Sequence, residues 1–441
     1  MVIFFIFYQF LQIFSLPLFL LYIIIRKIKN KPIFGKLSER VGFVPKPRSN
    51  KNVVWIHAVS VGEALSLQSF IEKIKKENPD TVCYLTVGTP TGKKIAQEKL
   101  QADVVSFLPY DFLPLIMLAY KRIKPKRLII IEAEVWPNLI MLAHFKKIPL
   151  SLINARISKR SRDRYHKFKL VLARLLNLFE KIYTQSNHDK HEFEALGVDT
   201  DKLEVLGDIK AYNVLEKKRK CAPFESLDPS IHPPSLFELR RTHGAGGLGT
   251  NGRLLVGSIH PGELDVYLKL YQALKPKYPN LKLTLAPRHF HWKRELISKT
   301  KAMGYSYIVW DNERKPANID SYDILLVCKL GELFTLYQQA TIYFLGGTFV
   351  PVGGHNLLEP AVWGKPSIIG PYNHNCRVIA KELIEHTGAI TVQSEQKLLE
   401  IVTGLFNSPE KIKSMGNNAR LWLEREGALV EKKLDSLIAS F

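Results

Sequence analysis

The feature that most constrains the fold is an alternation of short apolar runs and amphipathic segments, which occurs in two successive blocks of the chain. Apolar runs such as residues 53–58 and 127–131 predict buried strands, and the segments between them show the spacing of helices. Parallel strands need crossover connections, so this alternation predicts parallel sheets with helices on both faces. The 441 residues are also too many for one ordinary domain, and the sequence predicts two α/β domains.

A stretch rich in Pro, Gly and Ser, residues 216–253, separates the two blocks and is expected to be a linker with a local helix over 236–242. The predicted division is an N-terminal segment over 1–30, a first domain over 31–215, the linker, and a second domain over 254–441. Ligands of open α/β sheets bind beyond the carboxyl ends of the strands. We therefore expect a ligand cleft between two doubly wound, Rossmann-like domains.

Expected strands are assigned from these apolar runs. In the first block they span residues 53–58, 82–87, 104–108, 127–131, 150–153, 181–185 and 203–206, and in the second 254–258, 282–286, 324–327, 342–345 and 367–369.

The net charge of +22 predicts an anionic partner: nucleic acid, an anionic membrane or a phosphorylated small molecule. Residues 1–50 hold eight basic side chains and one acid, and residues 120–182 hold sixteen basic and four acidic ones. These clusters could bind anionic headgroups, or they could be ordinary solvated helix faces. No helix-turn-helix, zinc-finger or RNP pattern accompanies them, so we expect no nucleic-acid partner.

Residues 2–25 contain no charged side chain, and several basic residues follow directly. This pattern predicts a membrane anchor with the rest of the chain in the cytoplasm. Gln9, Gln12 and Pro17 weaken a membrane-spanning helix, so a helix lying in the membrane interface and a buried soluble helix are alternatives. The four cysteines are widely spaced and indicate neither a zinc site nor a disulfide framework.

Three acids follow expected strands and are candidates for acid–base chemistry. Glu63 lies at the start of a helix, whose N-terminus favours an ionised carboxylate that could act as a general base. A first-turn acid can also simply complement the helix dipole. Glu132 and Glu134 follow the strand at 127–131, and burial near a strand makes carboxylates costly unless they are paired or functional. Paired carboxylates can also bind metal, but no His or third acid lies nearby in sequence.

A second set of candidates could bind a phosphate. Lys210 and Arg288 each follow a strand, and the Gly-rich run at 346–356 should expose backbone N–H groups where a helix begins. Glu359, one turn further on, could bind ribose hydroxyls, and His355 is expected to be a loop hydrogen-bonding residue. The spacing matches neither GxGxxG nor a P-loop, so neither NAD nor ATP is indicated.

These segments together resemble the 3-deoxy-D-manno-octulosonic acid (Kdo) transferases, which attach Kdo to lipid A. The resemblance is collinear from about residue 30 into the second domain. The segments are KLSERVGF (36–43), HAVSVGEA (57–64), TPTG (89–92), LPYD (108–111), EAEVWPNLI (132–140), NARIS (154–158), GDIK (207–210), PRH (287–289), LGEL (330–333), GGHNLLEP (353–360) and GKPSIIGP (364–371).

The resemblance implies a GT-B fold with a lipid A acceptor domain over 31–215, a CMP-Kdo donor domain over 254–441 and an anchor in the inner membrane. It implies inverting transfer without a metal or cofactor. Glu63 corresponds to the general base, and Glu132 and Lys210 correspond to transition-state stabilisers. The residues that correspond to CMP-binding segments are Pro287, Arg288, Leu330, Gly331, Glu332, Asn356, Leu357, Leu358 and Glu359.

The sequence departs from many relatives at two of these motifs: GDIK stands where GSLK is common, and Cys328 stands where an acid is usual. The pattern is similar to chlamydial members, which implies addition of several Kdo units. Two alternatives stay open at this point. One is a membrane-associated GT-B enzyme that uses a UDP-sugar, and the other is a non-enzymatic membrane-anchored module that binds an anionic ligand.

Overall fold

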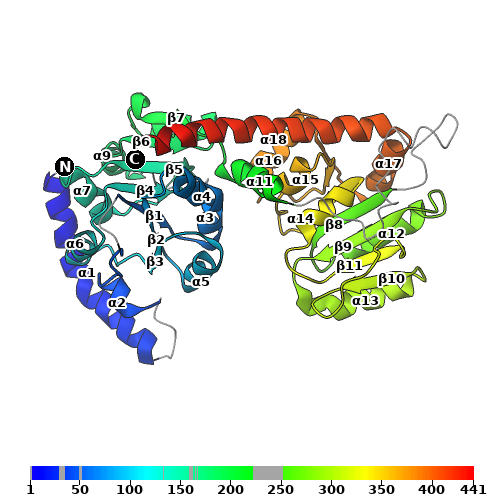
Figure 1. Cartoon of the computed structure of the whole chain (residues 1–441), viewed down its shortest axis with the longest axis horizontal. Helices are drawn as coiled ribbons and strands as arrows, with labels where there is room; N and C mark the ends of the chain where they lie inside the picture. The colour runs from blue at the N-terminus through cyan, green and yellow to red at the C-terminus, as the bar shows by residue number, and fades with distance from the viewer. Residues whose placement is uncertain are drawn as a thin grey trace. The chain divides into compact units, whose positions relative to one another are not determined.

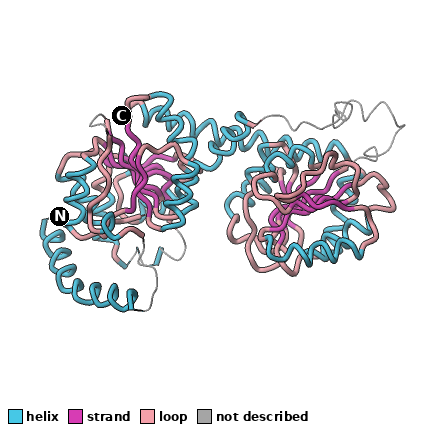
Figure 2. The backbone as a smooth tube through the Cα atoms, turned by 60° about the horizontal axis from the view of Figure 1, so that its bottom comes forward, coloured by secondary structure: helices cyan, strands magenta, loops and turns pink. Residues whose placement is uncertain are grey.

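The computed structural model describes residues 2–28, 35–48, 52–132, 134–157, 162, 163, 165, 167–221 and 252–441. The chain forms two compact units, Met1–Asn213 with Glu426–Phe441, and Val214–Arg425 (Figure 1). Each unit contains a parallel sheet with helices packed against it (Figure 2). This confirms the expected α/β fold with two parallel sheets.

The first sheet has the strand order β3-β2-β1-β4-β5-β6-β7, and all its pairs are parallel. The strand order reverses between β1 and β4, because the chain adds strands first on one side of β1 and then on the other. This position is therefore the topological switch point where ligands of such sheets bind. The strands are β1 (Val53–Ala58), β2 (Val82–Val87), β3 (Val104–Phe107), β4 (Arg127–Ile131), β5 (Leu150–Ala155), β6 (Lys181–Thr184) and β7 (Leu203–Val205).

Both faces of this sheet are buried, because successive side chains of a strand point to opposite faces and both sets are packed in apolar clusters. Val53 and Trp55 of β1 join the apolar cluster on one face, while Val54 and Ile56 join the cluster on the other. The helices of the first unit are α1 (Val2–Ile28), α2 (Leu37–Arg40), α3 (Val61–Ser66), α4 (Gln68–Glu77), α5 (Pro90–Lys99), α6 (Leu113–Ile123), α7 (Pro137–Phe145), α9 (Lys169–Leu176), α10 (Asn187–Ala195) and the start of α11 (Ile209–Lys220).

The second sheet has the order β10-β11-β9-β8-β12-β13-β14, so its switch point lies between β8 and β12. Its strands are β8 (Arg253–Ile259), β9 (Lys282–Pro287), β10 (Tyr307–Trp310), β11 (Ile324–Val327), β12 (Ile342–Leu345), β13 (Ser367–Ile369) and β14 (Ala389–Thr391). The sequence pattern predicted all except β10 and β14. These two short strands form the edges of the sheet, where fewer side chains are buried.

The helices of the second unit are α12 (Leu264–Leu274), α13 (Lys293–Ala302), α14 (Leu333–Leu336), α15 (Leu358–Val362), α16 (Arg377–Glu385), α17 (Glu395–Phe406) and most of α18 (Pro409–Ile438). The last sixteen residues, which the sequence placed in the second domain, belong to the first unit instead. Val430, Leu434 and Leu437 recur at helical spacing and pack in the cluster that contains Ile56 and Phe70.

The predicted linker at 216–253 differs from the structure at its start, because α11 continues as a helix to Lys220. Residues 222–251 of that linker, with the helix expected over 236–242, lie outside the described residues.

The helix expected near the N-terminus is present as α1, with Pro17 inside it. In the part of the chain that the structure describes, no helix is both long and apolar enough to cross a membrane.

Candidate active site

Glu63 lies at the switch point of the first sheet, in the first turn of α3 directly after β1. Ser60 caps this helix by accepting the Glu63 N–H at 3.2 Å, and Glu63 Oε2 accepts the Val59 N–H at 2.7 Å. This reciprocal arrangement resembles a capping box and holds the carboxylate in one orientation. Glu63 is only 8% exposed, so its carboxylate is fixed in place and largely removed from solvent.

Glu132 follows β4, the neighbour of β1, and has a left-handed backbone with φ +60°. Such a conformation is unfavourable for a residue with a side chain and occurs where the surrounding structure enforces it, often at functional sites. The Glu132 carboxylate binds the guanidinium of Arg156, which follows β5, with Nη2 to Oε2 at 3.1 Å. Glu132 and Glu63 thus follow the two strands that flank the switch point.

The carboxylates of Glu63, Glu132 and Glu134 influence each other electrostatically. Burial, followed by the charges of Glu63 and Glu132, raises the pKa of Glu134 to about 7. Burial also raises the pKa of Glu132, against the opposing effects of Arg156 and Lys210. Like charges that share a site disfavour full ionisation, so proton loss from Glu134 near neutral pH is coupled to the charges of its two neighbours.

Lys210 reaches the same cluster from the first turn of α11. Its backbone N–H donates to Asp208 Oδ1 at 3.0 Å, and the Ile209 N–H donates to Asn154 Oδ1 at 3.2 Å. Asn154 is fully buried at the end of β5 and, like Glu132, has a left-handed backbone. These contacts fix the start of α11, and with it Lys210, to the end of β5.

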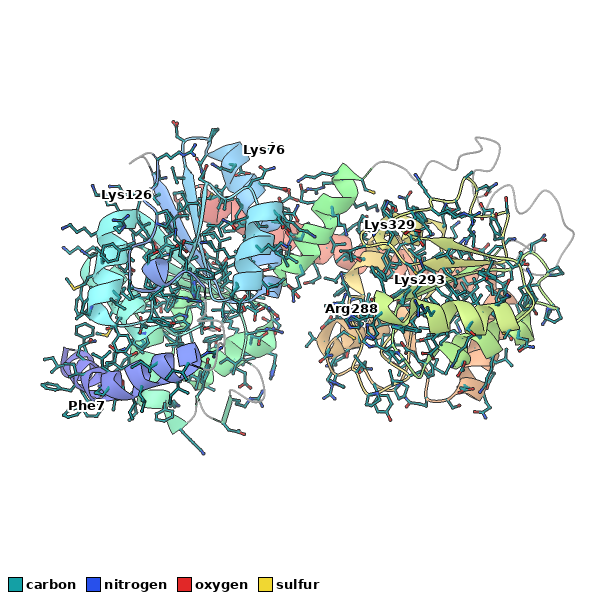
Figure 3. The ribbon with its side chains drawn as sticks, turned by 90° about the horizontal axis from the view of Figure 1, so that it is seen from below. Phe7, Lys76, Lys126, Arg288, Lys293 and Lys329 are labelled. Carbon is teal, nitrogen blue, oxygen red and sulfur yellow. The ribbon has the colours of Figure 1, made fainter. Side chains whose placement is uncertain are left out.

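The second site is at the switch point of the second sheet and is rich in histidine. Arg288 follows β9 and is labelled in Figure 3. Burial lowers the pKa of both His260, which follows β8, and His355, which follows β12, and the charge of Arg288 adds to this effect. Within the described segments, no three His, Cys, Asp or Glu side chains converge closely enough to hold a metal ion.

His260 and His355 form a hydrogen-bonded pair with 2.7 Å between their Nε2 atoms. Their ring planes differ by 8° and their centroids are 5.0 Å apart. A centroid distance this long, together with the short Nε2–Nε2 distance, means that the two rings meet edge to edge through these nitrogens. The rings therefore lie nearly in one plane, and one proton lies between the two Nε2 atoms. Burial first, and then the cationic surroundings, lower the pKa of His355 to about 4, which keeps this ring neutral at pH 7.

Glu263 joins the same two loops below the histidine pair. This fully buried carboxylate accepts the His260 N–H at 2.7 Å, the Gly347 N–H at 2.6 Å and the Phe349 N–H at 3.4 Å. Gly347 has φ +73°, and a Cβ atom there would lie 3.1 Å from the His260 ring. The glycine therefore allows the backbone of the Gly-rich loop to approach His260 closely.

The remaining residues that correspond to CMP-binding segments also lie at or just beyond strand ends of the second unit. Pro287 ends β9. The segment before α14 contains Leu330, Gly331 and Glu332, and the Glu332 carboxylate pairs with Lys329 at 3.1 Å.

Asn356 precedes α15, and its Oδ1 accepts the Leu358 N–H at 2.9 Å. Leu357 and Leu358 have buried side chains, so a ligand could meet them only through backbone atoms. The Glu359 carboxylate pairs with Lys217 at 2.8 Å. The expected ribose-binding acid is therefore already engaged by a lysine.

Four residues that contribute to the two sites were not predicted from the sequence: Arg156, Asn154, His260 and Glu263. Arg156 and Asn154 belong to the segment NARIS, whose position after a strand was a usable signal. His260 and Glu263 stand in GSIHPGEL, which also follows a strand. Each of the four acts through a contact with a segment distant in sequence, and the sequence pattern does not reveal such contacts.

Comparison with known proteins gives concordant matches. The family model described as "3-Deoxy-D-manno-octulosonic-acid transferase (kdotransferase)" matches residues 35–213. A 3-deoxy-D-manno-octulosonic acid transferase of Haemophilus influenzae is 31% identical, covering 98% of this chain and 97% of that protein. One of Aquifex aeolicus is 30% identical, covering 84% and 91%. Among solved structures, UDP-GlcNAc 2-epimerase from Neisseria meningitidis is similar with a TM-score of 0.58 and 13% identity over 88% of this chain and 100% of that one, a likeness of fold.

Proposed function

The chain belongs to the family of Kdo transferases, and from this premise we propose that it transfers Kdo from CMP-Kdo to a lipid A precursor in lipopolysaccharide core biosynthesis. Membership makes it an enzyme of the transferase class, which removes the alternative of a non-enzymatic binding module. The observation that carries the proposal is the group of three carboxylates at the switch point of the first sheet, with Arg156 and Lys210 beside them.

Glu63 is proposed as the general base. The acceptor is a primary hydroxyl of a lipid A disaccharide, which does not ionise near neutral pH and needs help to lose its proton. The Val59 N–H binds one oxygen of the Glu63 carboxylate, and no hydrogen bond to the other oxygen, Oε1, is found among the described residues. General-base catalysis by a positioned side chain typically accelerates a reaction about 10²–10⁴-fold.

Glu132 and Lys210 are proposed to stabilise the transition state, Glu132 by opposing the positive charge that develops at the anomeric carbon of Kdo and Lys210 by opposing the negative charge of the leaving phosphate. The ion pair to Arg156 supports the ionised form of Glu132 despite its burial. A carboxylate held in place before the reaction stabilises developing positive charge without reorganising.

The histidine-rich site on the second unit is proposed to bind the donor. CMP leaves with a negative phosphate, and Arg288 together with the backbone N–H groups of the Gly-rich loop suits that charge. The electrostatics of the transfer require no metal ion, because cationic and N–H groups of the protein supply the compensating charge. Attack on the face opposite the phosphate gives inversion at the anomeric carbon.

The proposed location is the cytoplasmic side of the inner membrane, where the lipid acceptor is embedded. Mass spectrometry of the lipid formed by purified protein from CMP-Kdo and a tetraacylated lipid A precursor tests the function and counts the Kdo units. We expect release of CMP and a product enlarged by one Kdo residue or by several in succession. Release of UDP from a UDP-sugar, with no turnover of CMP-Kdo, would establish the alternative GT-B activity.

A further inference from the structure

Lys217, which lies outside the motifs of the resemblance, contacts two of the proposed donor-binding segments at once. It is in the last turn of α11 and belongs to the second unit, as do α14 and α15. Its Nζ donates to Glu359 Oε1 at 2.8 Å and lies 3.9 Å from the centroid of the Phe334 ring. Glu359 is in the first turn of α15, and Phe334 follows the segment LGEL (330–333) directly. A single ammonium group therefore joins both segments.

The neighbouring Lys218 fixes the end of α11 along α15. Its Nζ donates to the Val362 carbonyl at 2.8 Å and lies 5.5 Å from the centroid of the Trp363 ring. Glu359 is the second residue of α15 and Val362 is the last, so two successive lysines bind both ends of this short helix. Figure 1 shows the end of α11 beside α15. The position of Lys217 is therefore set by the packing of two helices.

The aromatic partner of Lys217 is also held in place. Phe334 is 4% exposed and packs against Trp363, with the ring centroids 5.5 Å apart. An ammonium group is attracted to the electron-rich face of an aromatic ring. The Lys217 ammonium is thus held from two sides, by a ring and by a carboxylate, although half of its side chain is exposed.

The ion pair uses only one oxygen of the Glu359 carboxylate. Lys217 binds Oε1, and no hydrogen bond to Oε2 is found among the described residues. Both oxygens of a carboxylate are acceptors, so Oε2 can accept a hydroxyl of a bound ribose. The Glu359 side chain is 22% exposed, which leaves it within reach of a ligand. The lysine therefore orients this carboxylate and leaves its second oxygen open.

We propose that Lys217 is a positioning residue for the donor: it aims the Glu359 carboxylate at the ribose hydroxyls and so makes the site selective for a ribonucleotide. A nucleotide without these hydroxyls would displace water from the carboxylate and give no hydrogen bond in return, which is unfavourable. The inference rests on the proposed function, because the ribonucleotide that it concerns is the cytidine monophosphate of the proposed donor.

Binding of two nucleotides to the full-length protein, measured by calorimetry, tests the selectivity. The probes are CMP and dideoxycytidine monophosphate, which lacks both ribose hydroxyls. The wild-type protein should bind CMP about tenfold more tightly or better, the size of a hydrogen bond to a charged group. In Lys217→Met this preference should shrink to about twofold, because only CMP binding weakens. Lys217→Arg keeps the positive charge and should keep most of the preference.

Lys269→Met is the matched control, because it breaks an exposed pair with Glu395 in the same unit. It should keep the wild-type preference. Partly exposed ion pairs contribute little to stability, so the melting temperatures of both methionine variants should stay close to that of the wild type. An unchanged preference in Lys217→Met would overturn the proposal. Tighter CMP binding in that variant would also overturn it, because the lysine would then block the carboxylate.

A double-mutant cycle shows whether Lys217 acts through Glu359. Glu359→Gln should abolish the preference for CMP, and the addition of Lys217→Met should weaken CMP binding no further. Additive losses would mean that the lysine acts independently of Glu359 and would contradict the assigned role. In steady-state kinetics, Lys217→Met should raise the KM for CMP-Kdo about fivefold and leave kcat within about twofold of the wild-type value. A fall in kcat with an unchanged KM would exclude a role in donor binding.

Failure of this inference and failure of the proposed function give different results. Wild-type protein that binds CMP with no preference over the dideoxy compound would leave the proposed donor in place and overturn the roles of Lys217 and Glu359. Wild-type protein that binds neither nucleotide and does not turn over CMP-Kdo would reject the proposed donor, and the inference with it.

Discussion

Arg156 places two nitrogen atoms, Nε at 3.2 Å and Nη2 at 3.1 Å, on a single carboxylate oxygen of Glu132. The pair joins the ends of β4 and β5. Burial raises the pKa of Glu132, and the charge of Arg156 opposes this effect and so favours the ionised carboxylate. It leaves the second Glu132 oxygen, Oε1, without a hydrogen bond among the described residues. Such a carboxylate can interact with a reacting centre while its charge is maintained.

Replacing Arg156 should therefore impair turnover more than folding. Arg156→Gln removes the charge that favours ionised Glu132, and kcat should fall about 10- to 100-fold, the range for a charge-assisted hydrogen bond. Arg156→Lys should retain part of the rate because it keeps a point charge but not the paired contact. Steady-state kinetics measure both variants. Arg420→Gln, which breaks an exposed pair with Glu424 in α18, is the matched control and should be unaffected.

Glu63→Gln should lower kcat at least about a hundredfold, because the amide cannot take the acceptor proton. The carbonyl of the new amide side chain can still accept the Val59 N–H, so the melting temperature should change little. Glu77→Gln, at the exposed end of α4, serves as the control. An unchanged rate in Glu63→Gln would remove Glu63 from its role as the base.

The rate should rise with pH through about 7, as the coupled carboxylates lose their last proton. Glu134→Gln removes this titrating group and one negative charge, and it should move the midpoint of the rise to lower pH. The measurement is the pH dependence of kcat/KM. A midpoint that does not move would show that Glu134 is not coupled to the base.

Glu134 also predicts a pH dependence of stability. The pKa of Glu134 is higher in the folded chain than in the unfolded one. Its contribution to the free energy of unfolding is therefore fully present at pH values below the usual pKa of a carboxyl group. That contribution is lost as the pH rises through about 7. Glu134→Gln should stabilise the first unit by about 1–2 kcal/mol at pH 8, after allowance for partial solvent screening, and by almost nothing at pH 4. Urea unfolding at the two pH values measures the difference.

The histidine pair should matter for the donor and not for the acceptor. His355→Gln breaks the coplanar pair with His260 and should raise the KM for the donor about tenfold, the size of one hydrogen bond. The KM for the acceptor should stay unchanged, as should both constants in His386→Gln, an exposed control.

The histidine pair also predicts a loss of stability of the second unit at acid pH. The pKa of His355 is lowered in the folded chain, so the stability that its neutral form contributes is present above the ordinary histidine range and is lost as the pH falls toward about 4. The wild-type second unit should lose stability over this interval, and His355→Gln should reduce the loss. Thermal unfolding between pH 7 and pH 4 measures it, and identical pH dependence in the two proteins would contradict the assigned titration.

The sequence by itself determined the class of fold and most of its parts. β1, β2 and β4 have the bounds predicted from their apolar runs, because a strand buried on both faces must be apolar throughout. The same pattern placed Glu63, Glu132, Lys210 and Arg288 directly after strands. Parallel strands end at one edge of a sheet, so Glu63, Glu132 and Lys210, which follow strands of the first sheet, were already candidates for a common site.

Only the tertiary structure decided which distant residues meet. Sequence spacing places neither Arg156 on Glu132 nor His260 against His355, since each pair joins segments that are adjacent only through the strand order. The order itself, with its reversals between β1 and β4 and between β8 and β12, arises from packing that a local pattern does not encode. For α1, the sequence recorded only that residues 2–25 are uncharged. The side of the helix that faces the protein is decided by two buried residues, Asp111 and Asn138, which bind Gln12 of α1. They lie 99 and 126 residues from Gln12 along the chain.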